Sequence, residues 1–106
     1  MTIDYSTLSA DVFTPYVGQT LRFLDPEDRS AIIDVELTVA LERPEVTPRW
    51  AKRTSFSLLF EAAGDTELCN GHFLIEHPVE GPLGPFYITR TVPRDPARAC
   101  FQLVMN

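Results

Sequence analysis

The chain has 106 residues, of which 44% are hydrophobic and 23% are charged, as is usual for one globular domain. Nine basic and fifteen acidic side chains give a net charge of −6, which repels nucleic-acid phosphates and anionic lipid surfaces. These values exclude a disordered chain and argue against DNA, RNA or a membrane as a partner. We expect a single domain over residues 1–106.

The N-terminal segment has the pattern of one short helix. Ser6 can cap this helix, and Pro15 removes the backbone donor needed to continue it. Its apolar positions, which fall on roughly one side, are Leu8, Val12 and Phe13. The pattern predicts a helix of about two turns over 5–14 that covers one open end of the β-structure that follows.

Most of the remaining chain alternates apolar and polar residues, which is the pattern of half-buried β-strands. The longest run places five apolar residues on one parity: Ile33, Val35, Leu37, Val39 and Leu41. Clusters of Pro, Gly and Asp separate the runs and supply turn chemistry. Strands are predicted at about 19–24, 31–42, 54–62, 68–76, 86–92 and 101–105.

Two connections are rich in proline. Residues 43–52 are predicted as an exposed loop, because Pro44 and Pro48 remove backbone donors. The stretch from His77 to Pro85 contains three prolines and two glycines, so we expect a rigid connection there. Strands joined by short turns favour antiparallel pairing. The predicted fold is all-β, with about six antiparallel strands over 19–106 in a small barrel or sandwich.

His72, Glu76 and His77 are close in sequence and raise the question of a metal site. On a strand, residues 72 and 76 share a face while 77 points to the other, so the histidines converge only if the strand ends early at Pro78. No nucleophile, metalloprotease or phosphate-loop motif is present. We therefore predict no catalytic residue, no cofactor and no enzyme, with His72, Glu76 and His77 as weak metal candidates.

The two cysteines, Cys69 and Cys100, fall in separate predicted strands and lack the spacing of a metal-binding pair. We expect two buried free thiols, and a disulfide between them is the alternative.

The single tryptophan of the chain lies in its basic cluster, formed by Arg49, Trp50, Lys52 and Arg53. A Trp between cations can dock an acidic protein partner or stack on a base. On an acidic chain we expect instead a solvated loop whose Trp folds onto the sheet. Partner docking through Arg49, Trp50, Lys52 and Arg53 stays open as the alternative.

The chain also contains an ordered set of motifs: Tyr16-x-Gly18, the long alternating strand, Arg53-x-x-Phe56-Ser57-Leu58-Leu59-Phe60, Leu68-x-x-Gly71-x-Phe73, His77, and the run from Phe101 to Asn106. This order resembles a family of small bacterial all-β domains of unknown function (DUF6916-like), over nearly the whole chain from about Leu8. The resemblance implies no activity that can be carried over. It implies that members of the family occur together with phage-tail-collar-type proteins in bacterial genomes, and therefore that they have an assembly or accessory role.

We predict a non-enzymatic interaction or assembly-accessory domain, related to phage tails in the sense of that resemblance. It would contribute a sheet edge or a loop surface to a protein partner or to its own copies. We expect it in the cytoplasm or incorporated into a phage-tail-like particle. The alternative function is a small-molecule-binding or metal-dependent small β-barrel enzyme that uses His72, Glu76 or His77.

Overall fold

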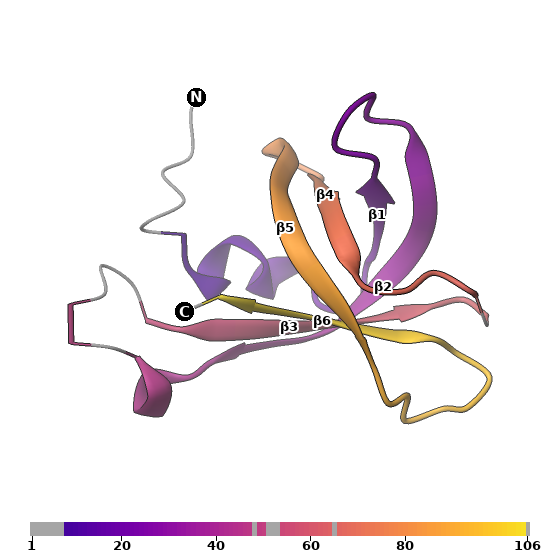
Figure 1. The fold of residues 1–106 in the computed structure, drawn as a ribbon. Helices are drawn as coiled ribbons and strands as arrows, with labels where there is room; N and C mark the ends of the chain where they lie inside the picture. The colour runs from indigo at the N-terminus through magenta and orange to yellow at the C-terminus, as the bar shows by residue number, and fades with distance from the viewer. Residues whose placement is uncertain (1–7, 48, 51–53, 65, 106) are drawn as a thin grey trace.

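The protein is a six-stranded β-barrel in the computed structural model, which describes residues 8–47, 49–50, 54–64 and 66–105 (Figure 1). The strands are β1 (Thr20–Leu24), β2 (Ala31–Glu42), β3 (Phe56–Ala62), β4 (Gly71–His77), β5 (Gly81–Thr91) and β6 (Cys100–Met105). Every described ladder is antiparallel, and the strand order around the barrel is β1-β2-β3-β6-β5-β4. The predicted all-β class is confirmed, and the barrel is the architecture found.

Pairing between β1 and β4 closes the barrel, because β1 also pairs with β2 on its other side. Each of the six strands therefore has a strand neighbour on both sides. The barrel therefore has no edge strand, although the ladder between β5 and β6 joins only part of the two strands. The ladder between β5 and β6 is short and covers Thr89–Thr91 of β5; the earlier part of β5 diverges from the later part of β6 (Figure 1).

The interior of the barrel is built from phenylalanine. All seven phenylalanines of the chain are at most 7% exposed: Phe13, Phe23, Phe56, Phe60, Phe73, Phe86 and Phe101. Phe23 lies at the centre, with its ring centroid 5.1 Å from Phe60 and 5.8 Å from both Phe73 and Phe101. Since a fully buried large side chain contributes about 1.5–3 kcal/mol, this cluster is a major source of stability.

The long strand β2 changes face at a β-bulge. Leu37 is fully buried in the core, and Thr38 is the extra residue relative to β3. Beyond the bulge Ala40 packs against the core, whereas Val39 is half-buried and Leu41 is 55% exposed. The prediction that every second residue from Ile33 to Leu41 faces the same side of the sheet is wrong after Leu37. The extra residue in β2 reverses the side to which each following residue points.

The predicted connection from His77 to Pro85 is mostly strand. β5 begins at Gly81, so the turn after β4 covers only 78–80. Over Gly81–Ile88, β5 forms its described ladder with β4 alone. A proline whose nitrogen faces away from β4 therefore removes no hydrogen bond from that ladder. Gly84 has a φ of +116°, and a Cβ there would lie 2.9 Å from the backbone nitrogen of Phe86. Glycine lets β5 pass this crowded point.

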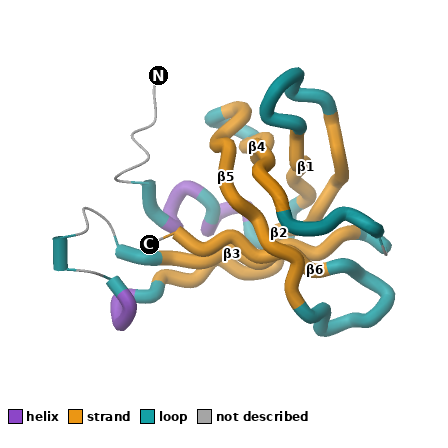
Figure 2. The backbone as a smooth tube through the Cα atoms, in the orientation of Figure 1, coloured by secondary structure: helices purple, strands orange, loops and turns teal. Residues whose placement is uncertain are grey.

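The N-terminal turns lie against β2 and cover one end of the barrel (Figure 2). The predicted short N-terminal helix is present as two consecutive 3-10 turns, η2 (Ala10–Val12) and η3 (Thr14–Tyr16). Pro15 lies inside η3, because the first residues of a helical turn need no backbone donor. Phe13, between the turns, is fully buried with its ring centroid 6.4 Å from that of Phe56. The predicted start at 5–7, including the Ser6 cap, lies outside the described residues.

Candidate functional site

The three weak metal candidates do not converge. His72 and Glu76 are exposed on the outside of β4, and the His72 ring lies 5.1 Å from that of Tyr87. His77 at the end of β4 is only 4% exposed and is turned inward. Within the described residues, no group of three or more His, Cys, Asp and Glu side chains is arranged to hold a metal ion.

His77 fastens the N-terminal turns to the β4–β5 turn. Its Nε2 donates to the carbonyl oxygen of Val12 at 2.7 Å, and its Nδ1 accepts from the amides of Val79 and Glu80 at 3.1 and 3.0 Å. Because Nδ1 accepts two hydrogen bonds, these contacts assign the proton of the neutral ring to Nε2. The ring of Tyr16 packs edge-on at 4.7 Å. Both ring nitrogens are therefore engaged in structural contacts.

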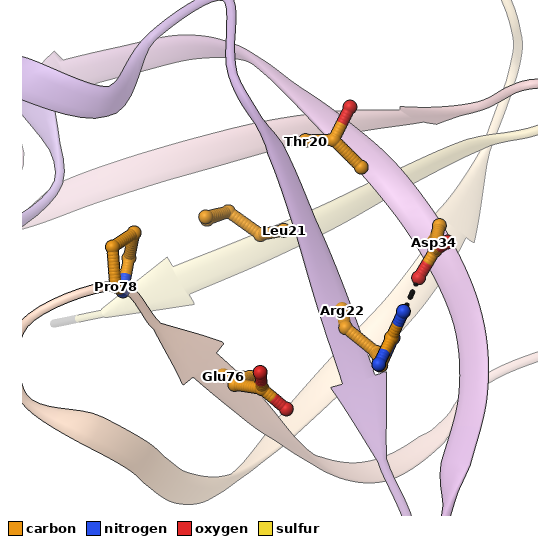
Figure 3. A pocket seen from close by; sticks show the side chains of 6 residues that line it. All are labelled: Thr20, Leu21, Arg22, Asp34, Glu76 and Pro78. Atoms are coloured by element: carbon orange, nitrogen blue, oxygen red, sulfur yellow. Dashed lines mark hydrogen bonds and ion pairs between the residues drawn. The ribbon is translucent and has the colours of Figure 1, made fainter.

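The outside of β1 carries a row of charges that runs across three strands (Figure 3). Arg22 of β1 is paired across the ladders with Asp34 of β2 and Glu76 of β4. Arg22 Nε lies 2.7 Å from Asp34 Oδ1, and their side chains are 47% and 56% exposed. The row borders a hollow of about 280 Å³ that is lined by Thr20, Leu21, Arg22, Asp34, Glu76 and Pro78. We call this surface the charged face.

The ion pair on the charged face shifts the pKa values of both of its members, Asp34 and Arg22. The hydrogen bond from Arg22 holds the pKa of the Asp34 carboxyl below its ordinary value, and the same contact raises the pKa of Arg22. Both groups are solvated, so water and salt screen the attraction. An exposed, mutually neutralised pair is suited to keeping the barrel hydrated.

A second ion-pair group lies on the outside of β2 and β3. Arg98 Nη2 lies 3.3 Å from Glu36 Oε1, and its Nη1 lies 3.7 Å from Glu61 Oε2. Arg98 Nε also donates to the carbonyl oxygen of Ala62 at 2.9 Å, which holds the β5–β6 connection against the sheet. The two carboxylates are therefore compensated from within the chain.

The cysteines are free and lie in different environments. Cys100 is 5% exposed opposite Glu61, and burial, with a smaller contribution from the Glu61 charge, raises the pKa of its thiol. Cys69 is exposed and precedes β4 rather than lying in it. The expectation of free thiols is confirmed, and the expectation that both are buried is wrong for Cys69.

The basic loop presents its tryptophan to solvent. Trp50 is 84% exposed and Arg49 beside it is also exposed, so the expectation that the Trp folds onto the sheet is wrong. The described pair lies beyond the ends of β2 and β3 (Figure 1). Lys52 and Arg53, the other two predicted docking residues, lie outside the described residues. An aromatic side chain in water next to a cation has the composition of a docking contact.

The outside of β2, β3 and β6 is a further surface, which sequence reasoning missed. Two cross-strand rows form it, and they contain Val39, Leu59, Gln102 and Thr89 in one row and Leu41, Ser57 and Val104 in the next. Neither row contains a charged side chain. We call these seven residues the neutral face. The signal in the sequence was the apolar pair Leu58-Leu59, in which one residue must face outward.

A hollow of about 440 Å³ adjoins this surface where β5 diverges from β6. Its lining residues are Gly84, Pro85, Phe86, Tyr87 and Met105. None of these lining residues is charged, and Tyr87 among them is 53% exposed.

Comparison with known proteins gives one match. A family model described as "Domain of unknown function (DUF6916)" matches residues 8–105, from the first N-terminal turn to the end of β6. No curated protein and no solved structure shows significant similarity to the chain. Among the described helices, none is long and apolar enough to cross a membrane.

Proposed function

Because the chain belongs to the DUF6916 family of domains, which has no assigned function, we propose from its own surfaces that it is a protein-interaction domain used in assembly. The observation that carries the proposal is the exposure of Trp50, which is 84%, in a chain that buries all seven of its phenylalanines. A domain able to hide every Phe leaves a Trp in water at the cost of unfavourable hydration, which contact with a partner would remove.

The contact is made by a loop and not by an edge strand, since the barrel is closed and each of its six strands has a strand neighbour on both sides. Arg49 beside the Trp favours a partner with acidic groups around an apolar pocket. Trp and Arg are the residue types enriched at the energetic centres of interfaces. Truncating such an anchor costs about 2 kcal/mol or more, which is roughly a 30-fold loss of affinity.

The wider setting belongs to the same proposal. The resemblance to a family that accompanies phage-tail-collar-type proteins supports a place in a tail-like assembly. The protein would be made in the cytoplasm and incorporated into that assembly. Nucleic acid and membrane remain poor partners for a chain with a net charge of −6.

The test is quantitative affinity purification from the native host with three tagged forms: the wild type, Trp50→Ala and Val92→Ala. Val92 is a matched control, because it is 86% exposed and lies in the loop after β5. We expect a protein recovered at fixed ratio with the wild type and Val92→Ala, and lost with Trp50→Ala at an unchanged melting temperature. Identical recovery with all three forms, or no stoichiometric partner at all, would contradict the proposal.

A further inference from the structure

The neutral face is a contact surface of a different kind from the Trp50 loop. In a chain of which 23% of the residues are charged, two adjacent rows across four strands contain no charged side chain. Leu41 and Val104, which flank Ser57 in one row, are 55% and 47% exposed. Depletion of charge together with exposed apolar side chains characterises the centres of protein interfaces.

From this face we propose that the protein forms a two-fold dimer by packing the neutral face of one copy on that of another. The row Leu41–Ser57–Val104 is complementary to itself, because the small Ser57, 7% exposed, leaves a low point between two larger side chains. A two-fold axis places a large side chain of one copy over the low point of the other. Sheets pack face to face in this way in β-sandwiches.

The neutral face is the surface at which contact between two copies adds least repulsion. Each copy carries a net charge of −6, so two copies repel each other at long range, but an uncharged interface places no carboxylates against each other. The neighbouring row contains Glu36 and Glu61, and both are already paired with Arg98 of the same chain. An approaching copy therefore meets no uncompensated carboxylate at this border. A basic partner attracted by net charge would bind elsewhere, for example near Asp34 and Glu76 on the charged face.

The expected dimer has an unusual response to salt. Its interface contains no attractive ion pair that salt could screen, whereas the long-range repulsion between two chains of charge −6 is screened. The dimer should become tighter as ionic strength rises. An interface held by the Trp50 loop and carboxylates would weaken under the same change.

Sedimentation equilibrium of the full chain, from about 1 to about 500 μM and in about 50 and 300 mM NaCl, tests the proposal. The variants are Val104→Glu and the matched control Val92→Glu, which adds the same charge away from the face. We expect a monomer–dimer equilibrium for the wild type and Val92→Glu, tighter at the higher salt. Val104→Glu should weaken it at least about 10-fold, because each dimer would then bury two carboxylates.

The proposal would be overturned by a wild type that stays monomeric throughout, by equal association of the two variants, or by a dimer that weakens with salt. If Val104→Glu fails to fold by circular dichroism, Leu41→Ser replaces it, with Ile32→Ser, 38% exposed outside the face, as its control. Trp50→Ala should dimerise like the wild type. Loss of dimer in Trp50→Ala alone would assign self-association to the loop and overturn the neutral face.

Discussion

The charged face and the neutral face lie on the outside of the same barrel and are built by the same strand pairing, yet they differ in chemistry. Across β2, β1 and β4 the cross-strand row is Asp34, Arg22 and Glu76. Beyond the bulge, the row across β2, β3 and β6 is Leu41, Ser57 and Val104. An antiparallel sheet that faces water normally alternates apolar inside with polar outside, and only the charged face follows that rule.

The difference between the two faces can be related to what a small domain needs, which is a hydrated surface and a stable core. The charged face and its screened ion pair keep the chain hydrated, and the Phe cluster inside supplies stability. The neutral face is required by neither hydration nor the core, and for this reason it points to contact with another molecule.

The largest change in the free energy of unfolding is expected when the two sides of strand β3 are compared by substitution. Leu58 and Leu59 are adjacent in β3, but Leu58 is fully buried and Leu59 is half-buried on the neutral face. Leu58→Ala should lower the free energy of unfolding by about 2–5 kcal/mol through the cavity it leaves. Leu59→Ala should lower it by about 1 kcal/mol or less. Urea unfolding below the dimerisation range measures both, and equal losses would refute the assignment of the two faces.

The next effect concerns the two histidines of β4. His77→Ala leaves the carbonyl of Val12 and the amides of Val79 and Glu80 without the ring that bonds them. We expect a loss of about 2 kcal/mol or more, because each buried unpaired polar group costs about 1–3 kcal/mol. Hydrogen exchange should also accelerate in residues 8–16. His72→Ala, on the exposed side, should stay within about 0.5 kcal/mol of the wild type. A stable His77→Ala protein with unchanged exchange would show that the turns are held by packing alone.

A smaller and local effect is expected from the two thiols. Burial and the Glu61 charge raise the pKa of Cys100, so its thiolate is scarcer than that of a free cysteine at any pH near 8. Exposed Cys69 should react with a thiol reagent in the folded protein, and Cys100 only after unfolding. Stopped-flow labelling of Cys69→Ser and Cys100→Ser distinguishes the sites. Rapid labelling of Cys69→Ser in the native state would contradict the burial of Cys100.

The smallest effect is the pH response of the charged face. Because Arg22 lowers the pKa of Asp34, the stability that their pair adds is complete above the ordinary Asp value of about 4 and is lost as pH falls through the lower folded value. In a carboxyl NMR titration, Arg22→Gln should return the Asp34 pKa toward its ordinary value, and salt should do so in part. Arg29→Gln, the same charge change in the β1–β2 turn, should leave it low. An Asp34 pKa unmoved by Arg22→Gln would exclude the pair as its cause.

Much of the fold could be predicted because the relevant signals are local. The bounds of β2 agree with prediction, since turn residues on both sides limit the alternating run. In the turn before β2, Asp25 and Asp28 accept from the amides of Glu27 and Ser30, a short-range bond that turn sequences reveal. The inward turn of His77 relative to His72 likewise follows from strand parity.

The rest depends on partners distant in sequence. The bulge at Thr38 is defined by its register against β3, and the alternation of apolar residues continues across it without a local sign. The prolines of β5 predict a connection, whereas the structure has a strand there, because a strand tolerates proline only where its nitrogen faces no ladder partner, and that depends on which strand lies on which side. The part of the neutral face beyond the bulge depends on that register, so the pair Leu58-Leu59 in the sequence indicates an outward apolar residue but not the extent of the face. The solvent exposure of Trp50 also depends on the conformation of its loop, which residue type does not fix.

The most direct test of the difference between the two faces is a methyl and amide NMR dilution series on the wild type, from about 500 to about 10 μM. We predict concentration-dependent shifts at Leu41, Leu59 and Val104, with the signals of Arg22, Asp34 and Glu76 unchanged. Spectra that do not change with concentration, or that change at the charged face instead, would contradict the account.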